Sequence, residues 1–341
     1  MDKEKFGDKE KLGDNEKFLH IENLRVEYKT DGKTAYAVNG IDFELNKGEV
    51  IGFVGETGAG KTSMALAIMK LIPSPPGRIA GGEVWFENKD IMTMSEKEMR
   101  AIRGNKITMI FQDPMTSLNP VLTVGEQIGE VIRLHNKLSA EEVRKKAAEM
   151  LEMVGIDGKR ADEYPHQFSG GMKQRVVIAI ALACNPSLLI ADEPTTALDV
   201  TIQAQVLELM VSLKERLGTS MIMITHDLGV VAEICDKVAI MYAGEIVEAG
   251  RIEEIFENRK HPYTEGLFDS IPDLEVEMPR LKSIKGMMPS PCDLPSGCVF
   301  APRCPYAMDI CDKKKPEKFY FSDDHYARCH RYDVRDTEEK L

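Results

Sequence analysis

A glycine-rich segment has the residue types and spacing of a phosphate-binding loop. The segment Gly55-Glu-Thr-Gly-Ala-Gly-Lys-Thr62 fits the pattern G-x-x-x-x-G-K-S/T, follows an apolar run and precedes a helix-like stretch, which argues against a mere connector. In such a loop the backbone N–H groups surround the β-phosphate, the lysine reaches the β- and γ-oxygens, and the hydroxyl ligates Mg²⁺. We therefore predict a site for a nucleoside triphosphate with Mg²⁺, built from Gly55, Glu56, Thr57, Gly58, Ala59, Gly60, Lys61, Thr62 and Ser63.

Two adjacent carboxylates end another apolar run, at residues 188–191. We predict that Asp192 holds Mg²⁺ through water, with Thr62 and Gln112 as the other metal-site residues, and that Glu193 orients and deprotonates the attacking water. The alternative is that the two acids only cap the following helix. Gln112 and His226 follow two further apolar runs, and we predict that they complete the catalytic group.

The elements that must position these residues are short buried strands. Apolar runs predict strands at 49–54, 106–111, 187–191 and 220–225, and a hairpin over 238–249 that turns at Ala243-Gly244. This alternation of strands with helical stretches predicts an α/β fold: a P-loop ATPase core with a mixed sheet and flanking helices. Ligands of open α/β sheets bind at the carboxyl ends of the strands, so the predicted residues should converge on one γ-phosphate.

A second predicted helix start also has the residue types of an anion-binding site. We expect a helical insertion subdomain over about 95–183, with helical spacing at 140–151. Within it, Ser169 is placed to cap a helix, and Gly170 and Gly171 permit close approach. No strand precedes this helix, so its role in a single chain is not evident from the spacing.

Composition limits the class of protein and of partner. The chain has 341 residues, 43% of them hydrophobic, and a formal charge of −12, which argues against nucleic acid as a partner. Residues 1–17 are predicted to be a charged mobile tail, and no run approaches the roughly 18 apolar residues of a membrane helix. Seven cysteines without an export signal indicate the cytosol, where a cysteine cluster is more often metal-binding or catalytic than disulfide-bonded.

The ordered motifs at 55–62, 112, 169–171, 192–193 and 226 resemble those of the ATP-binding-cassette ATPases over residues 20–250. The sequence FSGG stands here where the commoner form is LSGG. The resemblance implies that two cassettes associate head to tail, so that Ser169, Gly170 and Gly171 of one close on the ATP in the P-loop of the other. It also implies that Asp199 lies in the loop linking the two sites. Tyr28 is the residue that would stack on adenine, with Tyr36 as a nearby alternative.

A narrower resemblance lies after residue 260. The segments 261–272, 289–291 and 297–304 are similar to those of dipeptide/oligopeptide importer ATPases and their nickel-import relatives. This implies an ATP-hydrolysing motor at the cytoplasmic face of the membrane. Its implied partners are a second cassette subunit in a heterodimer, two permease subunits and, indirectly, an extracytoplasmic substrate-binding protein. Three alternatives stay open: a regulatory cassette with a weakly active ATP site, an importer of nickel or another small solute, and a cassette acting on DNA or ribosomes.

These features divide the chain into a tail at 1–17, a cassette at 18–254 and a C-terminal extension at 255–341, which includes a small Cys-rich module. Cys298, Cys304, Cys311 and Cys329 follow the spacing C-x₅-C-x₆-C-x₁₇-C in a proline-interrupted segment. Four thiolates suit either Zn²⁺ or a 4Fe–4S cluster, and the lack of C-x₂-C pairs makes an ordinary zinc ribbon less apt. The resemblance favours the iron–sulfur cluster, because importer ATPases with this tail carry one. Incidental buried thiols, as we expect for Cys184 and Cys235, are the alternative.

Overall fold

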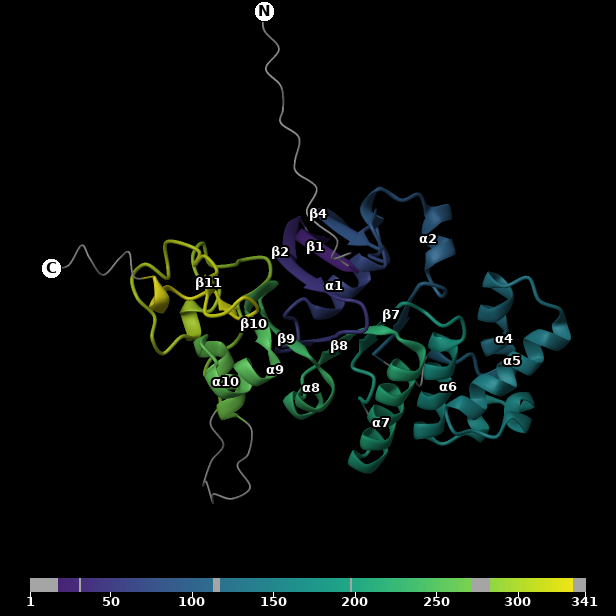
Figure 1. The fold of residues 1–341 in the computed structure, drawn as a ribbon. Coiled ribbons are helices and arrows are strands. Elements are labelled where there is room, and N and C mark those ends of the chain that lie inside the picture. Colours follow the sequence, from purple (N-terminus) through teal and green to yellow (C-terminus); the bar gives the residue numbers. More distant parts are fainter. Residues whose placement is uncertain (1–17, 31, 113–116, 197, 271–282, 334–341) are drawn as a thin grey trace, which may run out of the picture.

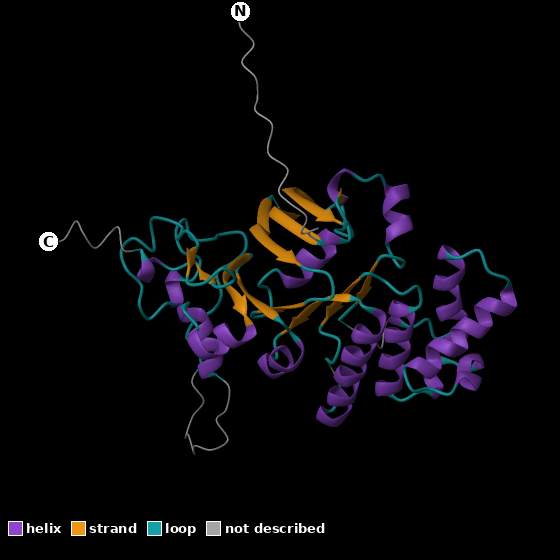
Figure 2. Ribbon diagram, in the orientation of Figure 1, coloured by secondary structure: helices purple, strands orange, loops and turns teal. Residues whose placement is uncertain are grey.

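The computed structural model describes residues 18–30, 32–112, 117–196, 198–270 and 283–333. The predicted tail at 1–17 lies outside these residues. An eight-stranded sheet crosses the molecule in the order β11-β12-β10-β9-β3-β8-β7-β6 (Figures 1 and 2). Its main strands are β3 (Val50–Val54), β6 (Ile107–Ile110), β7 (Leu188–Asp192), β8 (Ser220–Thr225), β9 (Lys237–Tyr242) and β10 (Glu245–Arg251).

The predicted strands and the hairpin are confirmed. Strands β6, β7, β8, β3 and β9 are parallel, and β10 runs antiparallel to β9 through a turn at Ala243 and Gly244. All residues of β3, β7 and β8 are buried, because layers cover both faces of the sheet. This is why these strands are continuous apolar runs rather than alternating ones.

A second, four-stranded antiparallel sheet has the order β2-β1-β4-β5. It consists of β1 (Leu19–Thr30), β2 (Lys33–Leu45), β4 (Gly77–Phe86) and β5 (Lys89–Asp90). Helix α1 (Lys61–Ile68) contacts β1 and β2 on one side and β7 on the other. One hydrophobic core, which includes Phe53, Met64 and Ile224, therefore joins the two sheets through α1.

Helices α6 (Gly170–Leu182), α7 (Val200–Leu217) and α8 (Leu228–Ile234) lie on the other side of the central sheet (Figure 1). Helices α4 (Val124–His135) and α5 (Ala140–Met153) pack on each other and on α6, and the short α2 (Glu96–Ile102) precedes them. Helices α2, α4 and α5 each begin with a capping box, at Ser95, Thr123 and Ser139, which the sequence pattern S/T-x-x-E specifies locally. The range 95–183 is not wholly helical, because it contains β6 of the central sheet.

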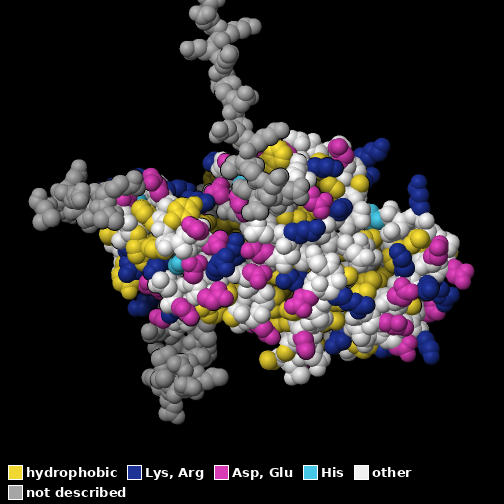
Figure 3. Space-filling view, viewed as in Figure 1, with side chains coloured by type: hydrophobic (Ala, Val, Ile, Leu, Met, Phe, Trp, Pro, Cys, Tyr) yellow, Lys and Arg dark blue, Asp and Glu magenta, His cyan; other side chains and the backbone are white. Residues whose placement is uncertain are grey.

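The chain continues after β10 into α9 (Ile252–Asn258) and α10 (Pro262–Asp269), and the described residues after 282 are mostly loops. Two short strands, β11 (Phe319–Tyr320) and β12 (Tyr326–Ala327), return to the central sheet, where β12 pairs antiparallel with β10. The extension thus shares a sheet with the cassette. No helix among the described residues is long and apolar enough to cross a membrane. Figure 3 shows basic and acidic side chains interspersed over the face in view.

Candidate functional site

The glycine-rich loop connects the end of β3 to the start of α1, as its sequence context predicts. Only glycine fits at two of its positions. A Cβ on Gly55 would lie 2.1 Å from the backbone oxygen of Met241, and one on Gly60 would lie 2.2 Å from that of Ala37. Gly60 also has a φ of 101°, which favours glycine. The loop therefore packs directly on neighbouring backbone and directs the free N–H groups at the start of α1 toward its concave side.

Lys61 lies inside this loop with 6% of its surface exposed. Its Nζ donates hydrogen bonds to the backbone oxygens of Gly55 (2.6 Å) and Glu56 (3.2 Å). Burial lowers the pKa of Lys61, while the carboxylates of Glu193, Asp192 and Glu56 counteract this effect. The lysine is thus an ammonium surrounded by the loop and faced by acids, which suits it to pair with a polyanion.

Asp192 ends β7 with 1% of its surface exposed. Burial raises the pKa of its carboxyl group, whereas a hydrogen bond with the Thr62 side chain lowers it. The Oδ1 atom of Asp192 is buried and has no hydrogen-bond partner among the described residues. A buried, unpaired carboxylate oxygen beside a hydroxyl offers the hard oxygen ligands that Mg²⁺ prefers, so the residues fit this ion.

Glu193 brings together the residues predicted at three strand ends. Its carboxylate accepts a hydrogen bond from Gln112 Nε2 (3.1 Å) and another from Thr196 Oγ1 (3.0 Å), and it lies 3.3 Å from His226 Nδ1. Burial raises the pKa of Glu193, but the bonds with Thr196, His226 and Gln112 outweigh it and leave the pKa below its ordinary value. The carboxylate is therefore ionised at neutral pH and can accept a proton.

The backbone at Glu193 is also unusual, with a φ of 48° in a residue other than glycine. Such conformations cost of order 1–3 kcal/mol and occur preferentially at functional sites. Thr196, which hydrogen-bonds to Glu193, had no predicted role. The only local signal for it is its place in the 195–199 segment directly after the acids.

The helix start predicted at Ser169 is confirmed. Ser169 caps α6 by accepting a hydrogen bond from the Met172 N–H (3.3 Å). A Cβ on Gly171 would lie 2.5 Å from Ile202 Cγ2 in α7, whereas a Cβ on Gly170 would meet no atom within 4 Å. Asp199 caps α7 through the Ile202 N–H (3.0 Å). The space beside Gly170 is thus open, while Gly171 packs against α7.

The predicted adenine-stacking residue lies beside the phosphate site. Tyr28 on β1 is half-buried, and its hydroxyl lies 3.2 Å from Ser63 Oγ in α1. Tyr36 on β2 is 43% exposed. Tyr28 thus has a direct contact with the start of α1, and its stacking on adenine stays a prediction.

The four cysteines of the predicted metal centre gather in one region of the extension. Cys298 N donates to Cys311 O (2.7 Å), and all four thiols lie within electrostatic range of one another. However, no group of three or more His, Cys, Asp or Glu side chains in the described residues could hold a metal ion, so the predicted centre is not supported by this geometry. In the chain alone, burial raises the pKa of Cys298 to about 12 and that of Cys329 to about 11.

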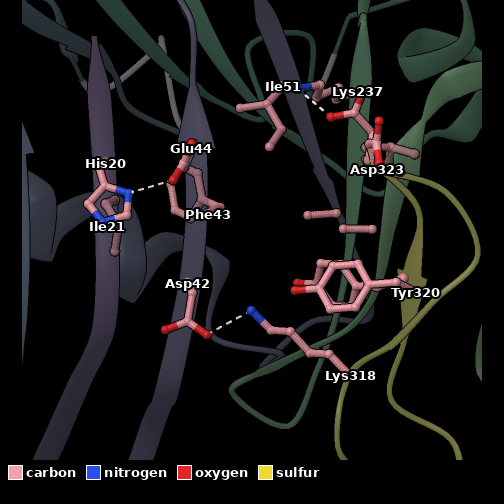
Figure 4. A pocket seen from close by; sticks show the side chains of 16 residues that line it. His20, Ile21, Asp42, Phe43, Glu44, Ile51, Lys237, Lys318, Tyr320 and Asp323 are labelled. Atoms are coloured by element: carbon pink, nitrogen blue, oxygen red, sulfur yellow. Dashed lines mark hydrogen bonds and ion pairs between the residues drawn. The ribbon is translucent and has the colours of Figure 1, made fainter. Parts of the chain in front are cut away.

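A cavity of about 340 Å³ lies away from the phosphate site, between the four-stranded sheet and the extension (Figure 4). Its walls are held by polar contacts: Asp42 pairs with Lys318 (2.8 Å), and Glu44 lies 3.0 Å from His20. Lys237 pairs with Asp324 (3.1 Å) on the far wall. These charges already have partners within the chain, so the cavity is a seam between the extension and the sheets.

Comparisons with known proteins agree with this geometry. Residues 38–196 match the family model described as ABC transporter, and residues 247–311 match that described as Oligopeptide/dipeptide transporter, C-terminal region. The oligopeptide transport ATP-binding protein OppD of Bacillus subtilis is 54% identical over 91% of this chain and 87% of its own length. The dipeptide transport ATP-binding protein DppD of the same organism is 50% identical over 93% and 95%.

A solved structure shows the same fold. The dimeric structure of MJ0796, a bacterial ABC transporter cassette, superposes with a TM-score of 0.62 at 31% identity, covering 69% of this chain and 98% of that one. The P-loop, the acids that end β7 and the capped α6 thus occur together in a cassette fold, and the matched extension follows them. The chain belongs to the ATP-binding proteins of the oligopeptide/dipeptide ABC transporter family.

Proposed function

We propose that this chain is the ATP-hydrolysing subunit of an importer of di- or oligopeptides, acting at the cytoplasmic face of the membrane. The observation that carries the proposal is the convergence of Gln112, Thr196 and His226 on Glu193, next to the P-loop lysine. Relatives named for oligopeptide and dipeptide transport match more than nine tenths of the chain, which supports peptides as cargo rather than nickel or another small solute.

In the proposed reaction, Glu193 accepts a proton from a water whose oxygen attacks the γ-phosphorus of ATP, and the bond to the β-phosphate oxygen breaks. Gln112 and His226 orient Glu193 and the water. Lys61 and the N–H groups of the loop bind the phosphates, and Tyr28 stacks on adenine. When bound, Mg²⁺ would neutralise phosphate charge, held by Thr62, Gln112 and, through water, Asp192.

We further propose a head-to-tail pair with a second, different cassette subunit. Ser169, Gly170 and Gly171 would close on the partner's ATP, with Asp199 linking the two sites, and the open space at Gly170 supports this. Two permease subunits and an extracytoplasmic binding protein would complete the importer. In this scheme residues 18–254 form the cassette, the helices within 95–183 its helical subdomain, and 255–341 the extension.

We also retain a 4Fe–4S cluster at Cys298, Cys304, Cys311 and Cys329 as a proposal. Their gathering in one region supports a shared role. Anaerobically purified protein should be brown and contain iron and acid-labile sulfide, and Cys304→Ser should lose both. Colourless protein with stoichiometric zinc, after expression with ample iron, would contradict the cluster.

Glu193→Gln tests the catalytic proposal. Without the base, Mg-ATP should still bind to the assembled transporter, but the steady-state turnover should fall about 100-fold or more. Glu208→Gln, on the exposed side of α7, is the matched control and should leave turnover unchanged. Turnover in Glu193→Gln equal to that of the wild type, with both low, would favour a regulatory cassette. Uptake of labelled peptides by cells that express this chain together with the permease subunits would test the proposed cargo.

A further inference from the structure

The extension reaches back to the P-loop through one side chain. Arg303 forms a two-pronged ion pair with the loop residue Glu56, with Nη1 at 2.8 Å from Oε2 and Nη2 at 3.1 Å from Oε1. The two residues are 247 positions apart in the sequence. The Arg303 side chain is only 5% exposed. Since the Glu56 side chain is 31% exposed, this contact is a partly buried link between the Cys-rich part of the chain and the glycine-rich loop.

The guanidinium of Arg303 is fixed from several sides. Its Nε donates to the backbone oxygen of Lys285 (3.0 Å), and Nη2 donates to that of Ile284 (3.3 Å). Its Nη1 also reaches the Tyr242 hydroxyl at 3.3 Å. A guanidinium with this many donors engaged has one orientation, so Glu56 meets a preformed partner rather than a mobile surface charge.

The backbone of Glu56 is held from the extension as well. The Glu56 N–H donates to the hydroxyl of Tyr263 in α10 (2.9 Å). Tyr263, Phe300 and Tyr242 form a buried aromatic cluster with ring centroids 4.6 to 5.4 Å apart. Tyr242 ends β9, which adjoins β3. The cluster therefore anchors both contacts of Glu56 to the central sheet.

The electrostatics indicate what this arrangement does. Glu56 lies within the loop proposed to surround the ATP phosphates and is close enough to Lys61 to influence its pKa. An uncompensated carboxylate there would repel a triphosphate and compete for the lysine. Arg303 is an opposite charge in hydrogen-bonding contact, which offsets that repulsion and holds the carboxylate in one orientation.

We propose that Arg303 is a positioning residue of the nucleotide site: it neutralises and orients Glu56, so that docking of the extension sets the affinity for ATP. The inference rests on the proposed ATP-binding function. It implies that a chain without a docked extension binds ATP weakly even though its phosphate-binding motif is intact.

The test is a double-mutant cycle in the full chain, with Kd measured for Mg-bound fluorescent ATP. Arg303→Met keeps the packing of the side-chain stem but removes the charge, and should weaken binding about ten-fold, the size expected for one charged hydrogen-bonded partner. Glu56→Gln keeps the backbone of the loop, removes the carboxylate and supplies the second single-variant Kd of the cycle. The double variant should recover to within about three-fold of the wild type, because the carboxylate that Arg303 compensates is gone.

Arg331→Ala is the control, since Arg331 lies in the same extension but pairs with Glu265 of α10 (3.1 Å); it should leave Kd unchanged. Wild-type affinity in Arg303→Met, or no recovery in the double variant, would overturn the inference. Should Arg303→Met not fold, Arg303→Gln takes its place in the cycle, with the same expected loss and the same recovery when combined with Glu56→Gln. Wild-type protein that fails to bind Mg-ATP would instead refute the proposed function itself.

Discussion

The stability of the folded extension should depend on pH through a single residue, His261. Its side chain is buried, and its Nδ1 accepts the Tyr263 N–H (3.1 Å), which caps α10. Burial lowers its pKa to about 4, while Glu248 acts in the opposite direction. Protonation would remove the cap acceptor and place a charge in the core. Because the unfolded chain binds the proton more readily, stability is lost as the pH falls from about 6.5 toward about 4.

We expect His261→Asn, which can retain the cap, to flatten this dependence. Between pH 7 and pH 5 the wild type should lose about 2 kcal/mol more than the variant in its free energy of unfolding, given the pKa difference. Urea unfolding at both pH values measures this. His166→Asn is the control because His166 is exposed. Parallel pH curves for the wild type and His261→Asn would show that His261 is not buried in its neutral form.

At the residue scale, the sequence predicts the positions of those functional side chains that local motifs determine. Lys61, Asp192 and Glu193 follow this rule, because the turn after a buried strand fixes where each one points. The partners of Glu56 do not follow it: Arg303 and Tyr263 reach the loop through tertiary packing across more than 200 positions, and no local pattern encodes that contact.

At the scale of elements, the start of α6 offers a clean test of the head-to-tail pair. A Cβ added at Gly170 would meet no atom within 4 Å, so a larger side chain should not disturb its own chain. Gly170→Tyr should keep the Kd for ATP of the isolated chain but reduce the ATPase activity of the assembled transporter at least ten-fold, because it obstructs closure on the partner's nucleotide.

The matched control is Gly81→Tyr on β4, another glycine whose Cβ would meet no atom within 4 Å. It should retain transporter ATPase activity, and both variants should unfold at similar temperatures. Full activity in Gly170→Tyr would contradict the proposed pairing, while weaker ATP binding by the isolated variant would indicate that Gly170 serves its own chain.

Some of the secondary-structure elements could be predicted from the sequence and others could not. The central parallel strands are short apolar runs because both faces are covered, and these were predictable. The four-stranded sheet was not specified, because β1 pairs with β2 through several register shifts that break the period-two alternation. Within the range 95–183, the apolar run at 106–111 correctly predicted β6, although the pattern around it is helical.

At the scale of the whole molecule, the extension is bound to three parts of the cassette at once. Its Lys318 pairs with Asp42 in the four-stranded sheet (2.8 Å), and its Arg303 pairs with the P-loop. Its His325 lies 2.9 Å from Glu248 of β10, and both side chains are at most 2% exposed. Removing the extension would leave Glu248 as a carboxylate without these partners in the sheet, which is costly.

The pairing of β12 with β10 has a consequence for solubility. A chain that stops at residue 254 would expose the backbone N–H and C=O groups of β10 as an open template for strands of other molecules. We expect such a chain to self-associate at micromolar concentration in light scattering, whereas one ending at residue 333 keeps β12 and should remain dispersed. A dispersed 254-residue chain would contradict this. By pairing with β10, the C-terminal segment would then prevent amyloid-like stacking between molecules. This role is separate from any binding of nucleotide or metal.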